Sequence, residues 1–349
     1  MNRNQKNLLI LLVLILVSYL YSYRTTYDEF DNSLILDGLE SNIKSNQEIL
    51  IFDSKNPFNF YDIINNIDNV SNQTVYGILT YPEIKKESYP LVIGVAGSLG
   101  WGEHHYKYLN EYQKLGIATL ALHSFNSRGV ESTVGEQISV TIPMVVHDSY
   151  MALKALSKNK KIDINKVGIT GWSLGGGVAL FTAWMPIKDA ISPNLKFAAH
   201  LPFYPPCVAK PQIAEFSDSP LHILAGEMDN WVPSEPCNEL VSDLNNNGYD
   251  NAGITIYKNS HHSFDRKSDI KIVESAYRLE ECSLLLDSNG IVSTNTAISI
   301  PMKNGFMQKL GLMLCAEKGP TMGGNDYARE SSLLFSKDFM QQHLLSSNQ

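Results

Sequence analysis

The sequence predicts an α/β fold, with a mostly parallel central sheet and helices on both of its faces. Two patterns indicate this fold. Short apolar runs of strand length recur along the chain, and several of them end at a glycine. Segments that suit helices lie between these runs. Short buried strands that alternate with helices form parallel sheets, because the connecting helices cover the faces of the sheet.

The expected elements follow one another from residue 75 onward. Residues 75–82 alternate in polarity and stop at Pro82, which is typical of an antiparallel strand. The apolar runs at 90–97 and 116–122 are typical of buried strands. Further strands are expected at residues 166–170, 196–204, 221–226 and 252–259, and helices at 144–159, 177–185, 234–248 and 327–345.

The composition indicates a globular protein and argues against a nucleic-acid partner. The chain has 349 residues, and 44% of them are hydrophobic, which is enough to form a sizeable core. Its net charge of −8 gives no basic excess to meet phosphates, so no nucleic-acid partner is expected. Nothing in the sequence indicates an oligomeric state.

The N-terminus has the pattern of a signal anchor or a signal peptide, assigned here to residues 1–24. Arg3 and Lys6 precede an uncharged run from Asn7 to Tyr23, which is about the minimum length for a membrane span. No small-x-small cleavage site follows it. We therefore favour a transmembrane anchor with the domain translocated, periplasmic or at the cell surface. The alternatives are secretion after signal cleavage and a buried core helix.

Residues 25–74 are rich in Asn, Asp and Ser, and we expect a spacer there, followed by one domain over residues 75–349. The chain has four cysteines and no C-x-x-C pair. An even set of cysteines fits disulfides outside the cytosol, with three pairings open, and a zinc site of the C-x-x-C type is not expected.

A candidate nucleophile lies in the sequence GWSLG, residues 171–175, between a predicted strand and a predicted helix. This is the G-x-S-x-G pattern, in which Ser173 occupies a strained turn that raises its hydroxyl above the sheet. The glycines leave room for the backbone to pass. The amide N–H groups at the start of the following helix point to where an oxyanion would form.

A serine nucleophile needs a base and a carboxylate that orients the base. In folds with this turn the carboxylate and the histidine follow the serine, each after a later strand. Asp229 follows the strand at 221–226, with Glu227 as the alternative. His261 and His262 both follow the strand residues ITIY (254–257), and only one of two adjacent side chains can face Ser173.

At these residues the sequence resembles the α/β-hydrolase superfamily and, within it, the dienelactone hydrolase family, over about residues 75–344. The matching segments are VIGVAGSLGW (92–101), GWSLGG (171–176), AGEMDNWVP (225–233) and YKNSHHSFD (257–265). The resemblance is to a secreted or membrane-anchored branch with a serine nucleophile. Family members often have His-x-Phe at the base, which implies that His262 is the base and that His261 is a neighbour or a substrate contact.

The resemblance also implies further site residues. The amides of Leu174 and Ser98, or of Leu99 in place of Ser98, would bind the oxyanion, although Ala96 stands where the family commonly has His. The segment LHSFNSRGV (122–130) would line the pocket, so that Arg128 either binds a substrate carboxylate or ties down its own loop. Trp101, Trp172 and Trp231 lie beside the motif loops and would form pocket walls or core. Implied disulfides join Cys207 to Cys237 and Cys282 to Cys315.

The resulting prediction is a serine hydrolase that cleaves a small-molecule ester, or a thioester or small amide, through an acyl-enzyme, with no cofactor and no metal. A metal site built on the pair His261 and His262 together with a second histidine pair, His104 and His105, is disfavoured, because their spacing matches no zinc motif. The alternatives are a peptidase of the prolyl oligopeptidase type and a non-catalytic binding protein on the same fold. The long segment between Cys282 and Cys315 would be a flap over the site or a plain insertion.

Overall fold

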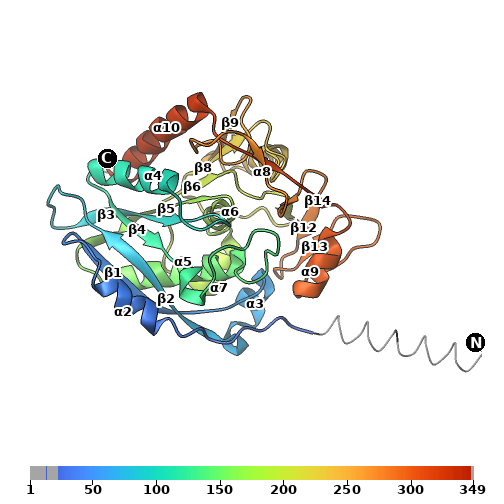
Figure 1. Cartoon of the computed structure of the whole chain (residues 1–349), viewed down its shortest axis with the longest axis horizontal. Coiled ribbons are helices and arrows are strands. Elements are labelled where there is room, and N and C mark those ends of the chain that lie inside the picture. The colour runs from blue at the N-terminus through green and yellow to red at the C-terminus, as the bar shows by residue number, and fades with distance from the viewer. Residues whose placement is uncertain (1–12, 14–22, 347–349) are drawn as a thin grey trace, which may run out of the picture.

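An eight-stranded sheet runs through the middle of the computed structural model, which describes Val13 and residues 23–346 (Figure 1). Its strands are β1 (Gln47–Lys55), β2 (Asn72–Thr80), β3 (Tyr89–Val95), β4 (Ala118–Leu122), β5 (Ile162–Trp172), β6 (Ala199–Phe203), β8 (Leu221–Gly226) and β9 (Ala252–Tyr257). Their order across the sheet is β1-β2-β4-β3-β5-β6-β8-β9. The pairs β1–β2 and β2–β4 are antiparallel, and all the others are parallel.

Helices cover both faces of this sheet. The helices are α2 (Ser33–Glu40), α3 (Phe60–Asn65), α4 (Glu103–Lys114), α5 (Ile142–Leu156), α6 (Leu174–Phe181), α7 (Met185–Ile191), α8 (Glu235–Asn246), α9 (Gly305–Leu312) and α10 (Asp326–Leu344), with short 3₁₀ turns η1 (Ile67–Asn69) and η2 (Asn126–Arg128). Helices α4 and α10 share one buried apolar cluster, while α5, α6 and α8 contribute to a second. The predicted α/β fold with a mostly parallel sheet is confirmed.

The two clusters explain why the central strands are apolar throughout. Every residue of β3 and of β4 is buried, because helices cover both of their faces. The long helices begin at side-chain caps: Thr141 accepts from Met144 N ahead of α5, and Asn325 accepts from Ala328 N ahead of α10. Local sequence and burial therefore agree along these elements.

The expected division between a spacer and a domain at residue 75 is wrong. Strand β1 lies at the edge of the sheet and pairs with β2 along its whole length, from Gln47 opposite Thr80 to Lys55 opposite Asn72. Phe52 and Ser54 of β1 are buried. The preceding segment is also attached, because Gln73 hydrogen-bonds both the N–H and the carbonyl of Phe30. The segment was predicted to be a spacer because it is rich in Asn, but it contains β1, an edge strand of the central sheet.

The signal anchor or signal peptide expected at residues 1–24 lies almost entirely outside the described residues. Among the helices in the described part of the chain, none is long and apolar enough to span a membrane.

Residues 258–325, between β9 and α10, form an excursion of short strands around α9. They are β10 (Lys271–Ile272), β11 (Tyr277–Arg278), β12 (Leu284–Leu286), β13 (Val292–Thr294), β14 (Glu317–Lys318) and β15 (Thr321–Met322). Strand β12 also pairs with β7 (Ala209–Pro211), so the excursion packs against the loop that follows β6. We call the part between Cys282 and Cys315 the insertion; a disulfide joins its two ends.

Candidate active site

Ser173 lies between the end of β5 and the first residue of α6, with φ 57° and ψ −115°. Such a positive φ is uncommon for a residue other than glycine, and strain of this kind concentrates at functional sites. The N–H of Ser173 donates to the carbonyl of Phe203 in the neighbouring strand, which fixes the turn. The strand-to-helix turn expected from the sequence is therefore present.

Two glycines make this turn sterically feasible. A Cβ atom on Gly171 would lie 2.1 Å from the carbonyl oxygen of Gly175, and one on Gly175 would lie 2.2 Å from the carbonyl oxygen of Val95. No side chain fits at either position, because each glycine is pressed against rigid backbone. The G-x-S-x-G spacing is thus a packing requirement of the crossing between β3, β5 and α6.

The structure brings together Ser173, His262 and Asp229, which the sequence placed in three separate loops. His262 Nε2 lies 2.9 Å from Ser173 Oγ, and His262 Nδ1 lies 2.7 Å from Asp229 Oδ2. An ionised carboxylate only accepts hydrogen bonds, so Nδ1 carries the proton and donates it to Asp229. In the neutral imidazole this leaves Nε2 with a lone pair directed at the Ser173 hydroxyl.

Asp229 is held on both of its oxygens. While Oδ2 accepts from His262, Oδ1 accepts from the backbone N–H groups of Trp231 and Val232, each at 3.0 Å. Asp229 and His262 are both buried, with exposed fractions of 4% and 2%. The carboxylate is therefore fixed in orientation and shielded from water.

The two alternatives left open by the sequence point elsewhere. The carboxylate of Glu227 accepts from the N–H of Asn259 at 2.9 Å, away from His262. His261 Nδ1 lies 2.8 Å from Thr321 Oγ1, and His261 lines neither of the cavities that reach Ser173. His261 therefore fits the role of a neighbour of the base, and its expected place in the substrate pocket is not found.

Backbone N–H groups stand beside the nucleophile. Leu174 is the first residue of α6, and the first N–H groups of a helix have no partner within that helix. The N–H of Ser98 donates to no other backbone group in the turns and loops of the described chain. The carbonyl of Ser98 is held by the N–H of Thr133 and the hydroxyl of Ser132, which fixes this loop. Ser98, Ser173 and Leu174 line one cavity.

Two cavities meet at Ser173. One has a volume of about 20 Å³, enough for roughly one water molecule, and is lined by Ser98, Ser173 and His262 among others. The other has a volume of about 370 Å³ and a mainly apolar wall. Its wall joins three parts of the chain: Phe58 and Phe60 near α3, Ile142 at the start of α5, and residues of the insertion such as Met302 and Leu312. The insertion thus forms one side of the larger cavity.

The three tryptophans have different positions. Trp231 lines both cavities, and its ring lies 4.8 Å from that of His262. Trp172 is fully buried against Phe203 and reaches only the small cavity. Trp101 donates from its indole N–H to the carbonyl of Leu122 and lines a separate hollow, so its expected place in the pocket wall is wrong.

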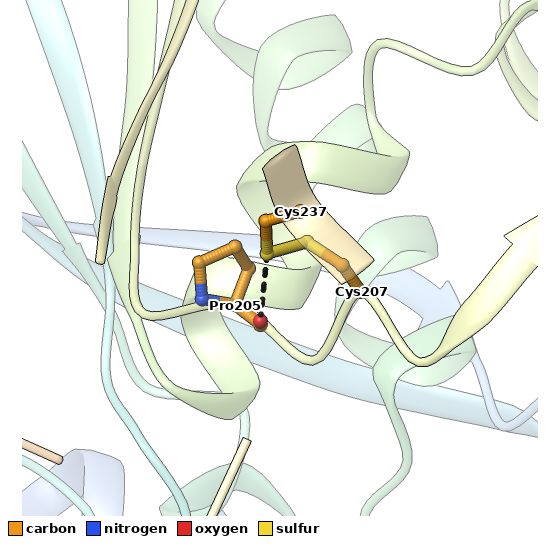
Figure 2. Close-up of a disulfide and its surroundings, with 3 residues drawn as sticks. All are labelled: Pro205, Cys207 and Cys237. Atoms are coloured by element: carbon orange, nitrogen blue, oxygen red, sulfur yellow. Dashed lines mark hydrogen bonds between the residues drawn. A yellow bond between two sulfur atoms is a disulfide. The ribbon is translucent and has the colours of Figure 1, made fainter. Parts of the chain in front are cut away.

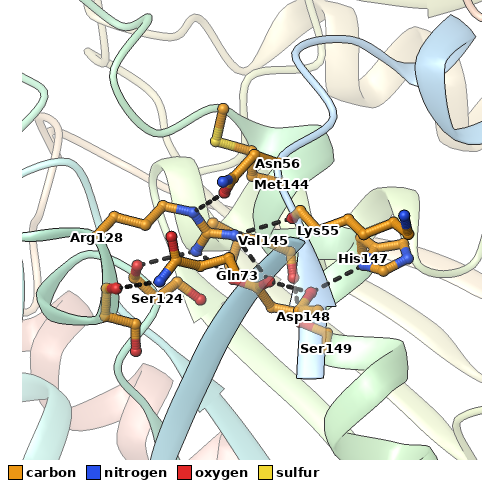
Figure 3. A network of polar contacts seen from close by, with 12 residues as sticks. Lys55, Asn56, Gln73, Ser124, Arg128, Met144, Val145, His147, Asp148 and Ser149 are labelled. Carbon is orange, nitrogen blue, oxygen red and sulfur yellow. Dashed lines mark hydrogen bonds and ion pairs between the residues drawn. The ribbon is translucent and has the colours of Figure 1, made fainter. Parts of the chain in front are cut away.

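Of the two roles left open for Arg128, the structure agrees with the tie to its own loop, and Arg128 lines neither cavity at Ser173. Its guanidinium makes two contacts with Asp148, at 2.7 and 3.0 Å, and the two side chains are 5% and 0% exposed (Figure 3). It also donates to the carbonyls of Ser124 and Lys55 and to the side chain of Asn56. Every nitrogen of the guanidinium is therefore used inside the fold, where it ties the loop after β4 to α5 and to the end of β1.

Two disulfides join Cys207 to Cys237 and Cys282 to Cys315, which are the pairings that the resemblance implies. Figure 2 shows the first of them, with Cys237 Sγ 3.5 Å from the carbonyl oxygen of Pro205. This bond attaches the loop after β6 to α8, whose preceding loop carries Asp229. Both bonds therefore fix loops that surround Ser173.

The second histidine pair is structural. His105 Nδ1 accepts from the N–H of Gly102 at the start of α4, and burial holds the pKa of His105 well below its usual range. Burial lowers the pKa of His104 to about 3. Within the described part of the chain, no group of three or more His, Cys, Asp or Glu side chains is placed to hold a metal ion.

Sequence reasoning missed the support behind His262. Tyr204, with φ 36°, packs the edge of its ring against His262 and donates from its hydroxyl to Asp265 Oδ1 at 2.8 Å. Asp265 is buried, and burial raises the pKa of its carboxyl to about 6. In the segment FYPPC, residues 203–207, the sequence analysis recognised only Cys207. Nothing in the sequence indicates the positive φ of Tyr204.

Comparisons with known proteins found a matching family and similar solved structures. Residues 123–283 match the model of the dienelactone hydrolase family. A dienelactone hydrolase-like promiscuous phosphotriesterase from metagenomic libraries is similar in structure, with 14% identity, a TM-score of 0.52, and coverage of 86% of this chain and 99% of that one. A putative dienelactone hydrolase from Klebsiella pneumoniae subsp. pneumoniae has 17% identity and a TM-score of 0.46, covering 62% of this chain and 89% of that one.

No curated protein matches this chain. The family match covers the segment that carries Ser173, Asp229 and His262, and the structural likeness extends over the sheet and its helices. Residues 123–283 therefore belong to the dienelactone hydrolase family, and the protein is a hydrolase with an α/β-hydrolase fold.

Proposed function

We propose that the protein is a serine ester hydrolase in which Ser173 is the nucleophile, His262 the general base and Asp229 the orienting carboxylate. The observation that carries the proposal is the continuous contact from Asp229 Oδ2 through His262 to Ser173 Oγ, with distances of 2.7 and 2.9 Å. The serine occupies a strained turn at the mouth of two cavities, so its hydroxyl is accessible to a substrate.

In the proposed reaction, Ser173 Oγ attacks the ester carbonyl carbon while His262 Nε2 takes the hydroxyl proton. The carbonyl oxygen becomes an oxyanion, which the N–H groups of Leu174 and Ser98 bind. The bond between the carbonyl carbon and the alkoxy oxygen of the ester then breaks. The alkoxy oxygen takes the proton from His262 and leaves as the alcohol. A water molecule then attacks the acyl-enzyme by the same route in reverse and releases the acid. Asp229 keeps the imidazole in the productive tautomer throughout.

The larger cavity supports an ester with a sizeable apolar group. Its volume of about 370 Å³ exceeds twice that of a cavity that binds benzene, about 150 Å³. Most of its wall is apolar and includes Phe60, Met302 and Leu312. Glu136 and Lys309 are the acidic and basic side chains among the apolar ones. The smaller cavity accepts only a group of about the size of one water molecule. Such a pair of cavities suits an ester with a large apolar group on one side of its carbonyl and a small group on the other.

The proposal includes a location outside the cytoplasm, with the N-terminal run as the membrane anchor. Two disulfides support this location, because disulfides persist in oxidising compartments.

A fluorophosphonate probe tests the proposal. The wild-type chain should be labelled, and Ser173→Ala should not be. Ser98→Ala is the matched control, because it removes a hydroxyl near the site and keeps the backbone N–H, so its labelling should persist. A folded wild-type protein that stays unlabelled, or a Ser173→Ala protein that is labelled as fast as the wild type, would refute the assignment of Ser173.

A further inference from the structure

Helix α9 and the turn that follows it present an apolar face to solvent, called here the apolar face of α9. Phe306 and Leu310 belong to the helix, and Met313 and Leu314 follow its last residue, Leu312, at the i+7 and i+8 positions of the same face. Their exposed fractions are 49%, 37%, 77% and 56%. Ile298, on the loop before α9, is 77% exposed. Contiguous exposed apolar residues mark sites of contact with proteins, ligands or membranes.

The beginning of the described chain is attached to this helix. Asn304, which caps α9, donates from its amide to the carbonyl of Tyr23 at 2.6 Å, and the N–H of Gly305 donates to Thr25 Oγ1 at 2.7 Å. In Figure 1 the described chain accordingly begins beside α9 and α3. The residues before Tyr23 are the uncharged run that begins at Asn7. The residues that follow the segment expected to enter a membrane therefore contact the domain at the start of α9.

The charge of the residues around α9 favours contact with a negatively charged surface. From Ser288 to Ala316 the chain has no Asp or Glu, and it has two lysines, Lys303 and Lys309. Lys309 is an exposed residue of α9 itself. Bilayer surfaces that contain anionic lipids attract basic side chains next to an inserted apolar face.

Resting on the membrane anchor of the proposed function, we propose that the apolar face of α9 lies on the surface of the lipid bilayer that the N-terminal segment would enter. The contacts with Tyr23 and Thr25 hold α9 beside the residue that directly follows the proposed anchor, so an anchor in the bilayer would bring α9 to the bilayer surface. The opposite side of α9 lines the larger cavity through Gln308 and Leu312, and Met313 belongs to both the exposed face and the cavity wall. Contact with lipid therefore places the cavity at the bilayer surface, where apolar esters partition.

Site-specific fluorescence tests this contact without any assay of hydrolysis. All four cysteines are in disulfides, so a single introduced thiol can be labelled selectively. The full chain carrying Leu310→Cys, labelled with a polarity-sensitive fluorophore, is reconstituted into vesicles of phosphatidylcholine and phosphatidylglycerol. The matched control is Leu334→Cys on α10, where the leucine is also exposed, at 60%. Nitroxide lipids should quench the Leu310 label several-fold more than the Leu334 label.

Equal, weak quenching of the two labels would overturn the proposal. So would shielding of the Leu310 label that needs no lipid and increases with protein concentration, because a second copy would then cover the face. A functional readout uses Phe306→Ser combined with Leu310→Ser: hydrolysis of a long-chain ester dissolved in the vesicles should fall several-fold, while that of a water-soluble acetate ester stays unchanged. Lipid quenching of the label in a wild-type protein that hydrolyses neither ester would refute the proposed function and leave the contact standing.

Discussion

Asp229 uses one carboxylate oxygen for His262, at 2.7 Å, and the other for two backbone N–H groups of its own loop. The carboxylate therefore cannot rotate without breaking one set of contacts, and it fixes which nitrogen of His262 carries the proton. We expect Asp229→Asn to lower kcat for a nitrophenyl ester by about 10³–10⁴-fold, because an amide N–H facing Nδ1 favours the wrong tautomer. Glu227→Gln is the control and should change kcat little; a larger loss there would move the role of the acid to Glu227.

Replacement of each histidine in turn identifies the base. His262→Ala should reduce hydrolysis of a nitrophenyl ester by several orders of magnitude, because it removes the nitrogen that lies 2.9 Å from Ser173 Oγ and would take its proton. His261→Ala should have a small effect, because its ring contacts Thr321 instead. Both rates are measured on folded protein, checked by circular dichroism. A severe loss in His261→Ala with an active His262→Ala protein would contradict the assignment.

Asp265 gives a pH dependence of stability with a definite sign. Burial raises the pKa of its carboxyl from 3.8 to about 6 in the folded state, so the folded protein binds this proton more tightly than the unfolded chain does. This group therefore makes the protein less stable as the pH rises from about 4 to about 6, and adds nothing further above that. We expect Asp265→Asn to gain about 3 kcal/mol relative to the wild type over this interval.

Urea unfolding of the two proteins at a series of pH values measures this difference. The amide oxygen that Asp265→Asn introduces can still accept the Tyr204 hydroxyl, so that the contact behind His262 is kept. A difference between the two proteins that does not change from pH 4 to pH 7 would show that Asp265 titrates normally.

Arg128 should matter for stability rather than for substrate binding. Arg128→Met leaves the carboxylate of Asp148 buried without its ion-pair partner, and we expect the free energy of unfolding to fall by about 3–5 kcal/mol. Lys196→Ala is the control, because its ion pair with Asp218 is exposed and should be worth less than about 1 kcal/mol. An Arg128→Met protein that is as stable as the wild type but has a raised KM would contradict this prediction. It would indicate that Arg128 binds a carboxylate of the substrate.

The insertion should control the length of the apolar group that the enzyme accepts. Leu312→Trp adds volume at the wall of the larger cavity, and we expect kcat/KM for a nitrophenyl octanoate to fall by at least about tenfold relative to the acetate. Leu334→Trp, on the far helix α10, should leave the ratio unchanged. An unchanged ratio in Leu312→Trp would place the apolar group of the substrate elsewhere.

The sequence predicted the parts that depend on local pattern. The buried strands showed as apolar runs, and Ser173, Asp229 and His262 each followed a strand whose end could be recognised. Parallel strands bring their ends to the same edge, so sequence order was enough to predict that these residues meet.

The parts that depend on distant partners were not predictable in the same way. Arg128 is buried because Asp148, 20 residues later, turns inward from α5, and the sequence of that helix does not distinguish an inward carboxylate from a surface one. Strand β1 lies at an edge, where only one face is covered, and its short apolar alternation disappears among Asn and Ser residues. Trp101 and His261 lie next to residues of the site in sequence, but their side chains leave the backbone in other directions.

Strand β1 has one more consequence, for the order in which the protein is made. Its Ser54 hydroxyl donates to Asp148, which lies 94 residues further along the chain, and its Lys55 carbonyl accepts from Arg128. The ribosome adds residues from the N-terminus at a limited rate, so β1 is complete well before those two partners exist. The first strand of this sheet to be synthesised therefore gains these two contacts only after residues 128 and 148 have been made.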